Sequence, residues 1–150
     1  MRLIPNHKTR SAWTRRGLAT LVALSVNAPC VAASNAGIAG RWVNPAHSVI
    51  IAIAPCGDAL CGTVKWASAK AKSDASASTG SLVGTRLLTG LYQQGAQWQG
   101  ELFVPDRNLH VEGRIERAGP GQLKVSGCAL GGLLCDSQLW TRAKGKLPAA

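Results

Sequence analysis

The cysteines are the residues whose spacing points most directly to chemistry in this 150-residue sequence. Four of the five form two close pairs, Cys56 with Cys61 and Cys128 with Cys135. An even number of cysteines in a small exported domain is typical of a disulfide framework. Three pairings can be drawn, and we predict the two local ones because they need the least rearrangement of the chain.

A four-cysteine zinc site is the alternative use of these residues. The two members of a pair would be separated by four residues in one case and by six in the other, whereas structural zinc sites favour spacings of about two to four. We therefore predict no metal site and no cofactor.

Residue types that could serve in catalysis are present but are scattered along the sequence. A base could come from His47 or His110, with acids and nucleophiles drawn from Asp58, Asp106, Asp136, Ser48 and Ser137. The sequence contains no nucleophile elbow, zincin helix or phosphate-binding loop, and His110 lies on the polar side of its segment beside Glu112. We therefore expect a noncatalytic protein, and an enzyme would require His47 and His110 to converge on one concave site with an acid between them.

The charge of the chain is concentrated at its start. The sequence has 17 Lys and Arg against 7 Asp and Glu. Five of these basic residues precede residue 18, and no acidic residue does: Arg2, Lys8, Arg10, Arg15 and Arg16. The remaining lysines are dispersed, at Lys65, Lys70, Lys72, Lys124, Lys144 and Lys146. This dispersal argues against a nucleic-acid partner and favours, at most, contact with anionic lipid.

Residues 1–33 have the order of a secretory signal peptide: a basic region, the apolar run 18–26, and small residues. We predict cleavage before Ser34, or alternatively after Ala32, which removes Cys30 with the leader. Arg15 and Arg16 fit either a Sec or a twin-arginine signal. The apolar run is too short to span a membrane, so we expect a periplasmic or secreted protein.

The rest of the chain alternates apolar and polar residues with a period of two, most clearly over 109–116. The same reasoning gives eight expected strands: 40–43, 48–54, 60–66, 86–92, 97–104, 109–116, 123–127 and 137–142. We predict one domain over 34–150, with a core over 38–143, folded as an all-β, up-and-down antiparallel barrel. A β-sandwich is the alternative, and 67–80 is either a short helix or a flexible loop.

Four glycines fall on the apolar side of their expected strands: Gly62, Gly100, Gly113 and Gly127. A missing side chain there lets a strand coil sharply or leaves room inside a barrel. Tight packing and a ligand cavity are therefore both open interpretations.

Two short motifs frame the predicted barrel. Gly40-Arg41-Trp42 opens it and Trp140-Thr141-Arg142 closes it. This resembles the calycin arrangement of lipocalins, which implies that Arg142 packs over Trp42 at the barrel floor. The order GRW, APCGDALCGTVKW, GTRLLTG, WQGELFVPD and KVSGCALGGLLCDSQLWTR also resembles the secreted bacterial family called domain of unknown function 2147. The sequence departs from that family's pattern after Pro105-Asp106 and in 67–78.

The resemblance implies an exported calycin-like barrel without an established activity. We expect it to bind a small apolar ligand or lipid in the cell envelope, without spanning the membrane. The alternative is a filled barrel that acts as a protein-interaction, structural or stress protein of the envelope. A hydrolase-type enzyme using His47 or His110 is the least favoured of the three.

Overall fold

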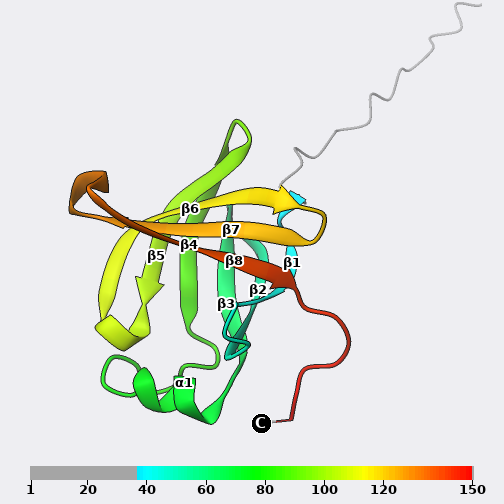
Figure 1. Cartoon of the computed structure of the whole chain (residues 1–150), viewed down its shortest axis with the longest axis vertical. Helices are drawn as coiled ribbons and strands as arrows, with labels where there is room; N and C mark the ends of the chain where they lie inside the picture. Colours follow the sequence, from blue (N-terminus) through cyan, green and yellow to red (C-terminus); the bar gives the residue numbers. More distant parts are fainter. Residues whose placement is uncertain (1–36, 150) are drawn as a thin grey trace, which may run out of the picture. The chain divides into compact units, whose positions relative to one another are not determined.

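The alternating pattern of the sequence forms eight strands that pair in chain order around a closed barrel (Figure 1). The strands are β1 (Gly40–Val43), β2 (Val49–Cys56), β3 (Ala59–Ala67), β4 (Arg86–Gln94), β5 (Gln97–Val104), β6 (Leu109–Gly119), β7 (Gln122–Ala129) and β8 (Leu134–Arg142). This computed structural model describes residues 37–149, and the predicted leader lies outside them. The prediction of an eight-stranded antiparallel barrel is confirmed.

Closure of the barrel depends on the first and last strands. β1 pairs with β2 along its four residues, and with β8 through Trp42 opposite Arg142 and Val43 opposite Thr141. Every neighbouring pair is antiparallel. A β-sandwich is thereby excluded.

The core lies on the inward side of the strands. In β6, Gly113 and Ile115 are buried while Arg114 and Glu116 are exposed, as the period of two requires. The largest fully buried side chains include Trp42 and Trp98. No polar or charged residue is buried within the described part of the chain.

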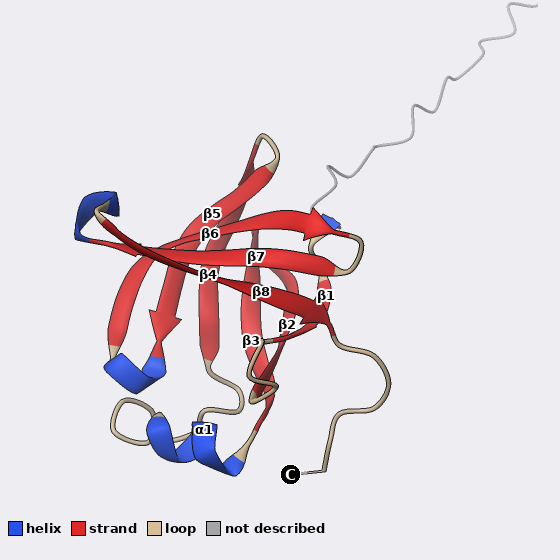
Figure 2. Ribbon diagram, viewed as in Figure 1, coloured by secondary structure: helices blue, strands red, loops and turns tan. Residues whose placement is uncertain are grey.

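One end of the barrel is covered by the long connection between β3 and β4. Part of it forms helix α1 (Ala69–Asp74), whose first turn is capped by the Ser68 hydroxyl. Ala75 and Leu82, which follow the helix, are buried in the core cluster. Figure 2 shows this segment next to η2 (Pro105–Arg107), and the Ser78 hydroxyl donates to the Pro105 carbonyl. The ambiguous segment 67–80 therefore contains a short helix.

The β7–β8 hairpin reaches beyond the other strands and ends in η3 (Leu130–Gly132) (Figure 1). β8 begins at Leu134, three residues earlier than predicted, and pairs with β7 over its whole length. β1 pairs with β8 at Thr141 and Arg142 alone. The stretch from Leu134 to Trp140 therefore has β7 on one side and no strand of the described chain on the other.

Candidate functional site

The first and last strands meet in a stacked pair of side chains. The guanidinium carbon of Arg142 lies 4.4 Å from the ring centroid of Trp42. The Trp42 indole N–H donates to the Ile38 carbonyl at 2.8 Å, and an Arg142 N–H donates to the Ala39 carbonyl at 3.4 Å. A Cβ at Gly40 would collide with the Arg142 guanidinium, so glycine at this position leaves the space that the arginine fills.

Two disulfides connect neighbouring strands, and both local pairings are confirmed. Cys56 and Cys61 join β2 to β3 with 5.7 Å between their Cα atoms. Cys128 and Cys135 lie directly opposite each other on β7 and β8, with their Cα atoms 4.1 Å apart. Within residues 37–149, no group of three or more His, Cys, Asp or Glu side chains could hold a metal ion.

The four inward glycines permit close packing. A Cβ at Gly62 would lie 2.7 Å from Leu88 Cδ1, and one at Gly127 would lie 2.9 Å from Leu102 Cδ2. At Gly100 the obstacle is backbone, since the Thr89 carbonyl oxygen would be only 2.5 Å away. The space at these positions is occupied by the barrel's own atoms, which favours the tight-packing interpretation over a ligand cavity.

Within residues 37–149, no strand pairs with the outer edge of β8 between Leu134 and Trp140, and we call this stretch the free edge. Cys135 faces Cys128 at a short Cα separation, typical of a pair that exchanges no backbone hydrogen bonds. Alternate residues of β8 therefore point their N–H and C=O groups away from β7, namely Cys135, Ser137 and Leu139. The Ser137 N–H donates to the Asp136 side chain at 2.8 Å.

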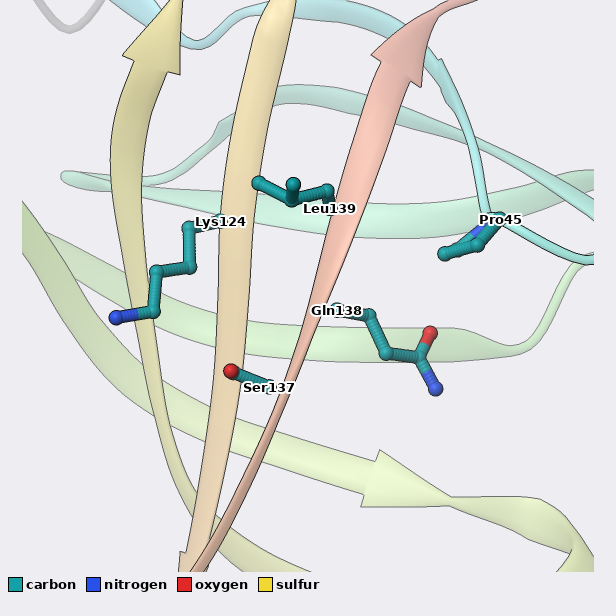
Figure 3. Close-up of a pocket in the computed structure, with 5 residues that line it drawn as sticks. All are labelled: Pro45, Lys124, Ser137, Gln138 and Leu139. Atoms are coloured by element: carbon teal, nitrogen blue, oxygen red, sulfur yellow. The ribbon is translucent and has the colours of Figure 1, made fainter.

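An open hollow borders this edge. It has a volume of about 560 Å³ and is lined by Pro45, Lys124, Ser137, Gln138 and Leu139. Figure 3 shows the Gln138 side chain extending from β8 toward Pro45, while Lys124 points to the other side of the strand. The Gln138 side-chain oxygen accepts the Trp140 indole N–H at 3.2 Å. A second hollow, of about 290 Å³, lies against the connection between α1 and β4.

Four exposed leucines belong to the same hairpin, three at its tip and Leu139 further along β8, and we call them the hairpin leucines. Leu130, Leu133, Leu134 and Leu139 have exposed fractions of 71%, 83%, 63% and 52%. They make up half of the eight large apolar side chains exposed in the described chain. Sequence reasoning missed them, although the run Leu-Gly-Gly-Leu-Leu between two cysteines signals apolar residues in a turn.

Comparison with protein families matches residues 40–142 to the family described as uncharacterized protein conserved in bacteria (DUF2147). The chain belongs to the DUF2147 family. The match runs from the start of β1 to the end of β8, so it covers the whole DUF2147 barrel, including both disulfides. Comparisons with curated proteins and with solved structures give no match.

The histidines of this DUF2147 barrel lie apart. His110 Nδ1 is 2.9 Å from Glu101 Oε1 on β5, and its ring stacks on Phe103 with 4.5 Å between centroids. His47 lies in the turn between β1 and β2. Within residues 37–149, no hydrogen bond links these histidines to each other or to the hydroxyls of Ser48 or Ser137.

The candidate acids also belong to different places. Asp58 lies in the β2–β3 turn, Asp106 in η2 and Asp136 on β8. Glu112, the acid beside His110 in the sequence, is bound by Arg114 at 3.0 Å instead. Glu101, the acid that does reach His110, could be identified only from the pairing register of β5 and β6.

The basic residues of the DUF2147 barrel form no single cluster. Lys70 pairs with Asp74 on α1 at 2.8 Å, whereas Lys124 lies on β7.

The C-terminal tail lies against the barrel, because Arg41 donates to the Gly145 carbonyl and Trp66 to the Ala149 carbonyl. In the part of the chain that is described, no helix has the length and apolar character needed to cross a membrane.

Proposed function

We propose that this protein is a noncatalytic interaction protein of the bacterial cell envelope that acts through the surface of its β7–β8 hairpin. The observation that carries the proposal is the contrast between the filled interior of the barrel and the exposed apolar side chains of this hairpin. Inside, Leu88 and Leu102 fill the space beside the inward glycines. Outside, the hairpin leucines remain exposed. Three of them, Leu130, Leu133 and Leu134, are neighbours in the sequence at the tip, and clustered apolar side chains on a protein surface mark sites of association.

The two disulfides support an extracytoplasmic location. Disulfides persist in oxidising compartments such as the bacterial periplasm and are rare in the cytosol. The Cys128–Cys135 disulfide joins β7 to β8 next to the leucine-rich tip of the hairpin. The predicted leader over residues 1–33 agrees with the same compartment.

The separation of the titratable side chains supports a noncatalytic role. A general base acts when it lies within hydrogen-bond reach of a nucleophile or substrate, and a third group usually orients it. Glu101 orients His110, but the exposed ring lies against Phe103 on an outer strand face, and no hydroxyl of residues 37–149 bonds to it.

A second candidate function is the binding of a small amphiphile, such as a lipid, in the hollow beside β8. Pro45 and Leu139 offer apolar contact there, and Lys124, which lines the hollow on the side away from Pro45 (Figure 3), offers a positive charge for an acidic head group. This candidate keeps ligand binding but moves it from the filled interior to the outer edge of the barrel.

Photocrosslinking in living cells tests the proposed function. A photoreactive amino acid replaces Leu133, and the matched control replaces Tyr92, which is 56% exposed on β4. We expect a discrete protein crosslink from position 133 and none from position 92. Equal crosslinking at both positions would contradict the proposal. A second result would also contradict it: no crosslink at position 133, together with a stoichiometric small molecule in native mass spectrometry. That combination would support the binding of an amphiphile.

A further inference from the structure

The free edge of β8 presents backbone N–H and C=O groups with which no strand of residues 37–149 pairs. We propose that it pairs with β8 of a second copy of this chain, antiparallel about a two-fold axis at Ser137. This inference rests on the proposed function and names a partner for the hairpin. Exposed strand edges are ready templates for pairing with another chain, and a two-fold interface uses the same surface on both copies.

The backbone groups available on β8 fix which residues can pair. Cys135, Ser137 and Leu139 point their N–H and C=O groups toward the free edge, as the register with β7 requires. Thr141 also points that way but is taken by Val43 of β1. An axis at Ser137 places Ser137 opposite its copy and Leu139 opposite Cys135, so all three available residues find partners.

Two observations favour this register over the registers with an axis at Asp136 or at Gln138. An axis at Asp136 would place the two Asp136 carboxylates directly opposite each other, and like charges in opposed positions destabilise a strand pair. An axis at Gln138 would bring Cys135 opposite Thr141, whose edge β1 already occupies. The axis at Ser137 instead puts each Asp136 opposite Gln138 of the other copy.

The side chains at these positions complement each other. Gln138 accepts the Trp140 indole N–H through its oxygen, which leaves its amide N–H groups to donate. Asp136 is an acceptor that now takes the N–H of its own neighbour, Ser137. On pairing, the Ser137 N–H turns to the opposite strand, and the Asp136 carboxylate accepts from the opposite Gln138 amide.

The same register also brings the hairpin leucines of each copy close to the surface of the other copy. Beyond the paired residues, Leu134 falls opposite Trp140 of the other copy, and Leu133 must turn away from the strand because Val43 already lies opposite Thr141. There the strand β1 and the turn at Pro45 end the pairing, and the hollow beside Pro45 lies open. Each copy therefore brings Leu134, and the tip that carries Leu133, to the Pro45 side of the other copy, where apolar contact would add to the hydrogen bonds of the edge.

Sedimentation equilibrium of the exported protein, recovered with both disulfides formed, tests the dimer. We expect the wild-type mass to rise with concentration from one copy to two. Ser137→Pro removes an edge N–H whose one hydrogen bond within residues 37–149 is to the Asp136 side chain, so we expect the barrel to stay folded. We expect it to raise the dimer dissociation constant at least about tenfold, while Tyr92→Ser leaves it unchanged. A single-copy mass at all concentrations, or a dimer insensitive to Ser137→Pro, would overturn the inference.

A charge exchange at position 138 tests the register itself. Gln138→Asp places a carboxylate opposite Asp136 and should weaken the dimer, whereas Gln138→Lys places an ammonium there and should strengthen it, less so at high salt. A purely structural role for Gln138 would move both variants in the same direction, and that result would overturn the register. Failure of dimerisation leaves the proposed function standing if position 133 still crosslinks to a different protein in cells.

Discussion

Arg142 of the last strand covers the indole face of Trp42 of the first, with 4.4 Å between the guanidinium carbon and the ring centroid. The two residues are also directly opposed in the β1–β8 pairing. Backbone closure and side-chain stacking therefore occur at one point. Because Trp42 is only 2% exposed, this point is part of the core rather than of the rim.

We predict that the two residues are energetically coupled. Trp42→Ala should cost about 3 to 5 kcal/mol of unfolding free energy, because it removes a large buried aromatic side chain. Arg142→Ala should cost about 1 to 2 kcal/mol through lost packing and cation–π contact. The double variant should lose less than the sum, since both changes destroy the same contact. Denaturant unfolding of the four proteins measures the coupling, and strictly additive losses would contradict it.

The disulfides should stabilise the fold by similar, modest amounts. Each closes a short loop, with sequence separations of 5 and 7. Replacing either pair with alanine should cost about 2 to 3 kcal/mol in the chain-entropy model. Unfolding in denaturant measures the loss, and peptide mapping without reduction checks the pairing. Free thiols at Cys56 or Cys128 in the wild-type protein would be inconsistent with this prediction.

Alanine substitution of the glycines should distinguish packing from empty space. Gly100→Ala should destabilise the barrel by about 1 to 3 kcal/mol, because its Cβ meets backbone carbonyls that cannot turn aside. Gly62→Ala should cost less, since the Leu88 side chain can shift. Gly80→Ala is the control, with no atom within 4 Å of its Cβ. Equal thermal midpoints for all three variants would instead indicate room inside the barrel.

The predicted leader can be tested by the mass of the exported protein. We expect a chain that begins at Ser34 and contains two disulfides, and thus four hydrogens fewer than the reduced form. In Arg15→Lys with Arg16→Lys, loss of export would identify the twin-arginine route, and retained export would identify Sec. An exported product that keeps residues 1–33 would refute the leader.

The number of strands and their inward faces could be predicted from alternation alone. The stretch 109–116 shows why: a half-buried strand needs apolar side chains at every second position, and β6 places Ile115 inside and Glu116 outside accordingly. The local disulfides could be predicted because short connections between strands bring close cysteines together.

The alternation of apolar and polar residues does not determine the register in which two strands pair. The contact of His110 with Glu101 depends on which residue of β5 faces which residue of β6, and the period of two is the same for many registers. The free edge of β8 depends on how far β1 extends, which the turn at Asn44 decides. The Asn44 side chain accepts the N–H groups of Ser48 and Val49 and so turns the chain away from β8.

Pairing of the first strand with the last also sets the order of folding. The hydrogen bond from Arg142 to Ala39 joins positions 103 residues apart, so the barrel cannot close until nearly the whole chain has been synthesised. Neighbouring hairpins can form early, but this contact must wait for β8, and such long-range contacts slow folding. A nascent chain that lacks its last strand thus remains unclosed, with the indole face of Trp42 uncovered until Arg142 arrives.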